Sequence, residues 1–103
     1  MIMPSLYIGD SSERGRGVFS SEPIPAGTTI EISPVIVMNK EERVLLDQTL
    51  LHDYIFEWGQ DETKCCVALG YLSLYNHDYK SNAEYVMDFD LQTIRITTVK
   101  YIK

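Results

Sequence analysis

Asn76 and His77 are the residues of this chain whose types and position best suit the binding of a polar ligand. They follow the apolar and aromatic run at residues 71–75 and precede a polar stretch that ends at Ser81. The amide and the imidazole together offer hydrogen-bond donors and acceptors on two short side chains. The same residue types also favour surface turns, so this segment alone allows both a binding site and a simple loop.

A second candidate segment lies near the start of the chain, at Arg14, Gly15, Arg16 and Gly17. Two glycines separated by one residue permit a positive φ and let a ligand approach the backbone closely. On its own, a Gly-x-Gly sequence more commonly marks a tight turn between strands. Its weight as a binding motif therefore comes from its pairing with the later Asn-His segment.

Length and composition restrict the class of protein. The chain has 103 residues, of which 45% are hydrophobic, and this suffices for a single domain over residues 1–103 but not for a second one. No apolar run approaches the roughly 20 residues needed to cross a bilayer, so no membrane association is expected. The first residues lack the basic flank and apolar stretch of a signal peptide, and a cytoplasmic protein is expected.

The acidic charge bears on the partners of the protein. A net charge of −6 argues against direct nucleic-acid binding, because phosphate contacts need clustered Lys and Arg. Such a charge could steer a basic peptide toward the protein. Solubility explains the same charge equally well.

The two cysteines, Cys65 and Cys66, are adjacent. A disulfide between chain neighbours strains the intervening peptide. The pair does not form a C-x-x-C sequence either, so no zinc or other metal site is predicted. We interpret both residues as small buried side chains in a strand.

Alternation and β-branched residues predict a mainly β chain with one short helix. Ile94 and Ile96 alternate with polar neighbours, which implies a strand with one buried face. Pro34 is expected to interrupt the extended chain. Asn39 and Glu42 form a capping-box pattern that predicts a helix from residue 39 to about 51. A packing role is expected for the apolar face of this helix, which consists of Val44, Leu45, Leu50 and Leu51. Strands are expected at residues 5–8, 18–19, 28–32, 35–38, 65–69, 84–89 and 93–99.

His52 and Asp53 raise the possibility of an acid–base pair. Neighbours on an extended strand point to opposite faces, and no Ser or Cys partner has supporting spacing, so a hydrolase dyad is not expected. Tyr54, Phe56 and Trp58 alternate. They are expected to share one face, either as core or as an aromatic lining.

Taken together, the glycine and Asn-His segments resemble the two cofactor motifs of a SET domain. Further matching residues at the proper order and spacing are Val18, Phe19, Ile24, Gly27, Gly70, Leu74, Asn82 and Ala83. The resemblance covers residues 5 to 103 approximately, and is closest to small SET proteins without flanking zinc-binding domains. It implies a β-clip fold of small sheets and methyl transfer from S-adenosylmethionine to a lysine of a protein or peptide substrate.

The resemblance also implies roles for the two segments. Backbone groups of residues 14–17 would hold the methionine part of S-adenosylmethionine. Asn76 and His77 would hold its amino-acid and adenine parts. Tyr54, Tyr71 and Tyr75 are candidates for an aromatic channel that desolvates the substrate lysine and so favours loss of its proton. Each tyrosine is equally compatible with an ordinary half-buried position.

Three features depart from the family pattern. Ser81 replaces a proline, which loosens a turn, and Asp78–Tyr79 replaces the usual Ser-Cys, so the zinc site of larger members is not expected. The sequence also ends before the Gly-Glu-Glu-Leu segment and the active-site tyrosine of the family. A C-terminally incomplete domain is therefore expected, either part of an enzyme or a non-enzymatic module that binds a peptide or a partner chain. An uncovered apolar groove, lined by residues near Leu74, Tyr75 and the Ile94–Ile96 hairpin, would favour a homodimer.

Overall fold

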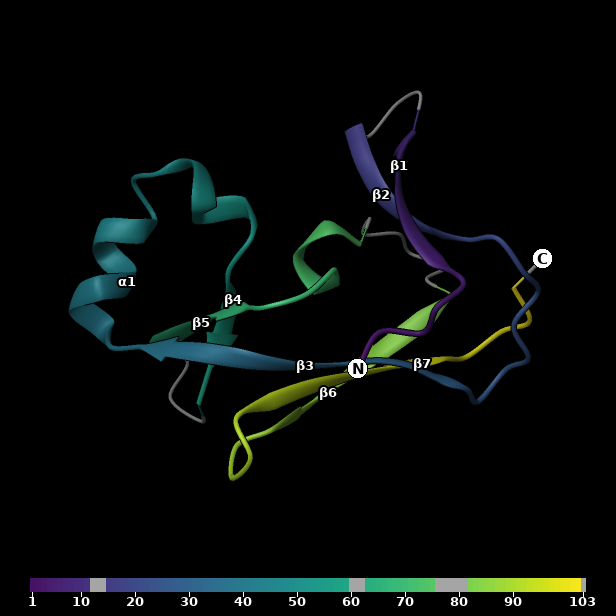
Figure 1. Cartoon of the computed structure of the whole chain (residues 1–103). Helices are drawn as coiled ribbons and strands as arrows, with labels where there is room; N and C mark the ends of the chain where they lie inside the picture. The colour runs from purple at the N-terminus through teal and green to yellow at the C-terminus, as the bar shows by residue number, and fades with distance from the viewer. Residues whose placement is uncertain (12–14, 60–62, 76–81, 103) are drawn as a thin grey trace.

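Two antiparallel sheets and a short helix make up the part of the chain that the computed structural model describes, residues 1–11, 15–59, 63–75 and 82–102 (Figure 1). Strands β1 (Leu6–Ser11) and β2 (Gly15–Ser20) pair as a two-stranded sheet. The five-stranded sheet has the order β4-β5-β3-β7-β6. Its strands are β3 (Thr29–Met38), β4 (Phe56–Trp58), β5 (Lys64–Ala68), β6 (Ala83–Asp88) and β7 (Thr93–Thr98). The mainly β chain of small sheets confirms the predicted fold class.

Strand β3 runs through Pro34, so the predicted interruption there is wrong. The strand changes partner at this point: Thr29 to Pro34 pair with β7, and Val35 to Met38 pair with β5. A proline has no N–H to donate to a ladder, but its carbonyl can still accept. The carbonyl of Pro34 accepts from the amide of Leu69 at 3.0 Å. The switch of partners therefore lets a proline occupy the middle of a continuous strand.

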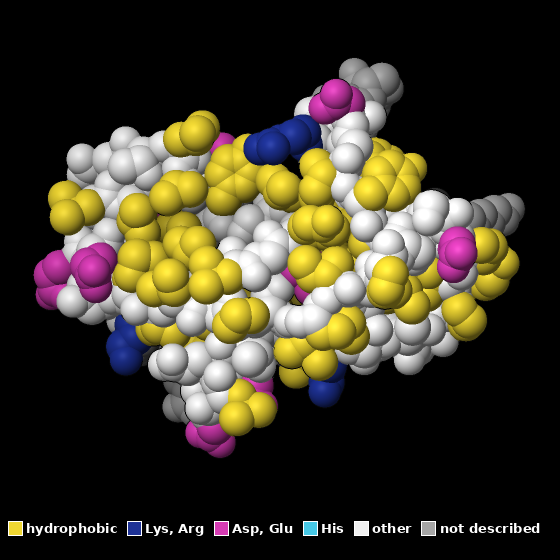
Figure 2. Space-filling model, in the orientation of Figure 1, with side chains coloured by type: hydrophobic (Ala, Val, Ile, Leu, Met, Phe, Trp, Pro, Cys, Tyr) yellow, Lys and Arg dark blue, Asp and Glu magenta, His cyan; other side chains and the backbone are white. Residues whose placement is uncertain are grey.

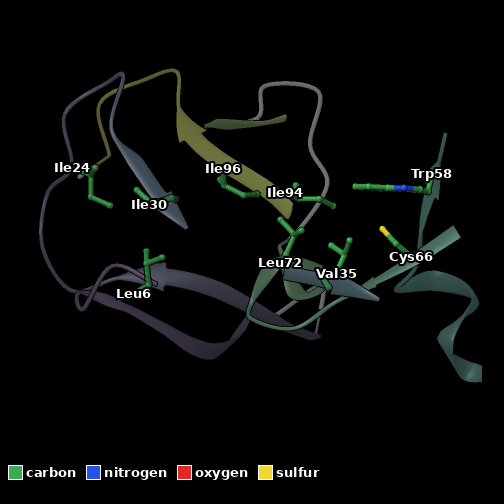
Figure 3. Close-up of a cluster of buried hydrophobic side chains, with 10 residues drawn as sticks. Leu6, Ile24, Ile30, Val35, Trp58, Cys66, Leu72, Ile94 and Ile96 are labelled. Atoms are coloured by element: carbon green, nitrogen blue, oxygen red, sulfur yellow. The ribbon is translucent and has the colours of Figure 1, made fainter. Parts of the chain in front are cut away.

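The buried side chains form a row between the large sheet and the segments that cross it. Ile94 and Ile96 on β7 are buried while Arg95 between them is exposed, which confirms the alternation predicted for this strand. Leu6 of β1 and Leu72 face the same row from the other side, and Trp58 and Cys66 continue it at the β4–β5 end (Figure 3). Both cysteines are buried and unbridged, as predicted.

The helix is shorter than predicted and does not pack as predicted. Helix α1 (Lys40–Leu46) is followed by a separate 3-10 turn, η1 (Leu50–Asp53). The helix buries no side chain, and Val44, Leu45, Leu50 and Leu51 are all exposed. The expected packing role of this apolar face is therefore wrong, because α1 projects from one end of the large sheet rather than lying across it (Figure 1).

Strand β4 begins at Phe56. Tyr54 directly follows η1 and does not belong to β4, so it does not alternate with Phe56 and Trp58 on one strand as expected. His52 lies in η1, where its Nδ1 atom is 3.2 Å from Asp47 Oδ1 on the exposed surface. In the described residues, no helix has the length and apolar character needed to cross a membrane.

Candidate functional site

The glycine segment begins strand β2. Gly15 has a φ of 70°, in the left-handed region that glycine adopts without a steric penalty. No atom lies within 4 Å of the place where a Cβ would stand on Gly15, while Gly17 is buried two residues later. Within the described part of the chain, β1 is the one strand that pairs with β2, so backbone groups on the other edge of β2 could bind a ligand. Arg14 lies outside the described residues.

The second segment approaches this strand through the 3-10 turn η2 (Leu72–Leu74), which contacts β2. Figure 1 shows η2 in green, unlabelled, below the β1–β2 hairpin. Asn76 and His77 themselves lie outside the described residues. The structure therefore brings the chain leading to the Asn-His pair against the glycine strand, from opposite ends of the sequence.

A buried carboxylate joins η2 to the large sheet. Glu31 of β3 is 0% exposed, and its carboxylate accepts three hydrogen bonds. The Oε2 atom accepts from the Ser33 hydroxyl and from the Tyr71 amide, the latter at 2.9 Å. The Oε1 atom accepts from the Tyr75 hydroxyl at 3.1 Å. Because a buried charge without partners is very costly, these three donors make the position tolerable.

The environment of Tyr75 keeps it a hydrogen-bond donor. Burial raises the pKa of this phenol well above its ordinary value, and the negative charge of Glu31 and the hydrogen bond to it raise the pKa further. Gly70 lies against the same group, and a Cβ there would overlap Glu31 Oε2 and Ser33 Oγ. The pocket for the carboxylate is thus closed on the side where the chain enters η2.

Each of the three candidate tyrosines is connected to η2, two as its neighbours in the sequence and one through a hydrogen bond. Tyr71 and Tyr75 flank the turn and are half-buried against the core. The backbone carbonyl of Tyr54 accepts from the Ser73 hydroxyl at 2.8 Å. Their roles as channel residues, and those of Gly15, Arg16, Gly17, Asn76 and His77 as cofactor ligands, remain predictions.

Sequence reasoning missed Glu31 and Ser33. Strict alternation from Ile30 would place Glu31 on the polar face of its strand. A bulge between Thr29 and Glu31 shifts the register against β7 and turns Glu31 inward. Bulges often re-aim a side chain next to a functional site. The signal in the sequence was weak, because no local residue type marks a bulge at this point.

The residues present suit S-adenosylmethionine in part. The open space at Gly15, and the edge of β2 with which no described strand pairs, suit a ligand with a charged amino-acid group, which backbone N–H and C=O groups can bind. Hydrophobic side chains gather near η1, β4 and η2 and again around the foot of the β1–β2 hairpin, with a basic side chain between the two areas and acidic groups toward the outer ends of the molecule (Figure 2). Among the described residues, no cluster of three His, Cys, Asp or Glu side chains could hold a metal ion.

Comparison with known proteins adds an independent observation. A histone-lysine N-methyltransferase of Schizosaccharomyces pombe, specific for lysine 37 of histone H3, is 42% identical over 104 residues, which cover 100% of this chain and 69% of that protein. A crystal structure of a Plasmodium falciparum protein assigned as a histone methyltransferase matches with a TM-score of 0.71 and 31% identity, over 99% of this chain and 87% of that one.

A third match shows the fold alone. Chaetomium thermophilum Polycomb Repressive Complex 2, in an autoinhibited conformation bound to S-adenosylmethionine, matches with a TM-score of 0.77 at 18% identity, over 98% of this chain and 14% of that one. The family described as SET domain matches residues 15–103, which include the glycine strand, η2 and both strands of the final hairpin. The chain belongs to the SET-domain family.

Proposed function

We propose that this chain is an S-adenosylmethionine-dependent protein-lysine N-methyltransferase domain. The observation that carries the proposal is the 42% identity to a histone-lysine N-methyltransferase over the full length of the chain. The contact between β2 and η2 supports it, because it brings residues 72–74, which lead to the Asn-His segment, against the glycine strand. A lysine in a protein or peptide is the proposed substrate.

The chain's own residues would contribute mainly by positioning and by excluding water. When bound, S-adenosylmethionine supplies an electrophilic methyl group on a positively charged sulfur. Placing a neutral lysine amine in line with that methyl group can remove several kcal/mol from the barrier. Half-buried aromatic side chains such as Tyr54 and Tyr71 would surround the lysine stem, and desolvation there favours its neutral form. The net charge of −6 would attract a basic substrate.

The experiment is a calorimetric titration of the protein with S-adenosylmethionine. We expect Asn76→Ala to weaken binding by roughly 1–3 kcal/mol, the usual cost of leaving a buried polar partner unpaired. Asn39→Ala is the matched control, since Asn39 caps α1 at the far end of the large sheet. Equal affinity of the wild-type protein and Asn76→Ala would remove Asn76 from the site.

Methyl transfer to a lysine peptide separates the enzyme from the alternative, a SET-like module that only binds a peptide or a partner chain. Incorporation of a labelled methyl group into a histone-derived peptide is expected for the enzyme. Peptide binding without incorporation at saturating S-adenosylmethionine would favour the module.

We also propose that two copies of the chain associate through strand β6. The groove expected near the Ile94–Ile96 hairpin cannot provide this interface, because Ile94 and Ile96 are buried in the core. This strand is an edge of the large sheet and carries the exposed side chains of Tyr85 and Val86. Beside it lies an open groove whose lining includes Ile32, Asp88 and Arg95. Edge strands of two copies can pair antiparallel about a twofold axis, which would bring Arg95 of each copy toward the acidic end of the other groove.

A further inference from the structure

Glu31 is an unusual residue for the interior of so small a protein. Among the described residues it is the charged side chain that the core encloses completely. An apolar residue at this position would avoid the cost of removing a carboxylate from water. The hydrogen bonds of Glu31 therefore indicate what the carboxylate contributes to the fold.

Two of those three hydrogen bonds go to one short segment far along the chain. The Tyr71 amide lies immediately before η2 and binds Oε2, and the Tyr75 hydroxyl lies immediately after η2 and binds Oε1. The two oxygens of one carboxylate thus hold both ends of the same turn. The third donor, Ser33, comes from β3 itself and orients the carboxylate.

We propose that Glu31 is a positioning residue for the cofactor segment and that the Tyr75 hydroxyl is its link to that segment. Tyr75 directly precedes Asn76 in the sequence, so a carboxylate that holds Tyr75 sets the point from which the Asn-His pair starts. This role rests on the proposed function, in which Asn76 and His77 bind S-adenosylmethionine. It gives the Tyr75 hydroxyl a partner within the protein rather than the substrate lysine.

Substitutions of Glu31 can distinguish the effect of its hydrogen bonds from the effect of its negative charge. In Glu31→Gln, the amide oxygen can accept from Ser33 and Tyr71, and the amide nitrogen can donate to the Tyr75 oxygen. The isosteric variant therefore keeps all three links while losing the charge. Glu31→Ala loses all three links, and Tyr75→Phe loses one while leaving the carboxylate with its other two donors.

The experiment compares S-adenosylmethionine affinity by calorimetry at a temperature where each variant is folded. We expect Tyr75→Phe and Glu31→Ala to raise Kd about tenfold, equivalent to 1.4 kcal/mol. Glu31→Gln is expected to stay within about threefold of the wild-type Kd. Tyr85→Phe, on the exposed edge strand, is the matched control and should bind as the wild-type protein does.

Amide hydrogen exchange supplies a readout that does not depend on the cofactor. Tyr75→Phe should accelerate exchange at residues 71–75 and leave β3 and β7 protected, because the lost link is local. A merely structural role predicts lower global stability with an unchanged Kd for the folded protein.

Each outcome bears on one proposal. A wild-type Kd for Tyr75→Phe, or a loss in Glu31→Gln as large as in Glu31→Ala, would overturn the positioning role. If the wild-type protein itself binds no S-adenosylmethionine, the proposed function fails, and exchange alone then decides whether Glu31 holds residues 71–75. If Glu31→Ala does not fold, Tyr75→Phe still tests the link, since it retains the buried carboxylate.

Discussion

Cys66 shows how burial changes the chemistry of a single side chain. It lies on β5 opposite Phe56 of β4 and is 0% exposed. Burial raises the pKa of its thiol from the ordinary 9.0 to about 11, and the neighbouring Cys65 adds to this effect. At neutral pH the thiol is therefore protonated and unreactive, which agrees with a packing role.

The raised pKa predicts a loss of stability in alkaline solution. Between pH 9 and pH 11 the unfolded chain releases the Cys66 proton while the folded chain keeps it, so the free energy of unfolding falls as pH rises. The loss attributable to Cys66 should reach about 1–3 kcal/mol. Urea unfolding of the wild-type protein and Cys66→Ala at pH 8, 9, 10 and 11 measures it. The variant should show the shallower decline, and equal declines would contradict the assignment.

At the scale of the element, helix α1 is stabilised locally rather than by the core. Asn39 accepts from the Glu42 amide at 2.8 Å, and the Glu42 carboxylate accepts from the Asn39 amide at 3.1 Å, as the capping-box pattern predicted. Arg43 attaches the helix to the sheet through Glu57, at 3.1 Å, and through the carbonyl of Lys64. With no side chain buried, the helix depends on its cap and on these surface contacts.

Loss of the cap should therefore destabilise the helix without unfolding the protein. Asn39→Ala removes a cap contribution of about 1 kcal/mol, so exchange of the α1 amides should accelerate roughly fivefold. The midpoint of global thermal unfolding should move little, because α1 contributes nothing to the buried row. Exposed Gln48 lies just after the helix, and Gln48→Ala serves as the control. A large drop in the global midpoint of Asn39→Ala would show that α1 is coupled to the core.

At the scale of the whole molecule, the arrangement of the sheets leaves large apolar side chains on the surface. Ile32 and Ile36 lie on the outward face of β3, and Leu91 lies at the β6–β7 turn. Extended apolar surface is uncommon on stable monomers and usually marks a contact with another molecule. A second copy of the chain is the proposed occupant of the β6 edge.

Light scattering at tens of micromolar protein and moderate salt tests this association. The wild-type protein should give twice the 11.8 kDa mass of one chain. Val86→Lys on β6 should return the protein to the monomer, because a lysine in the interface adds like charges that face each other across the twofold axis. Val44→Lys, the same exposed substitution on α1, should leave the dimer intact. A wild-type monomer under these conditions would exclude the β6 interface.

Local chemistry in the sequence determined much of this protein. The alternation around Arg95 predicted the buried face of β7, the Asn39–Glu42 pair predicted the helix start, and Gly27 takes the left-handed turn position with a φ of 79°. Each of these depends on residues within a few positions of one another. The glycine and Asn-His segments likewise identified the family without any coordinates, because their types and order are specific together.

Only the tertiary structure decided the features that depend on a distant partner. Pro34 lies within a strand because β3 exchanges β7 for β5 at that residue. Val44, Leu45, Leu50 and Leu51 are exposed because no element of the described chain packs across them, which a helical pattern cannot reveal. Glu31 faces inward because a bulge shifts its register, and two of its three donors come from Tyr71 and Tyr75, 40 and 44 residues away. Hydrogen bonds over such separations follow from how the sheets meet, and no local pattern in the sequence encodes them.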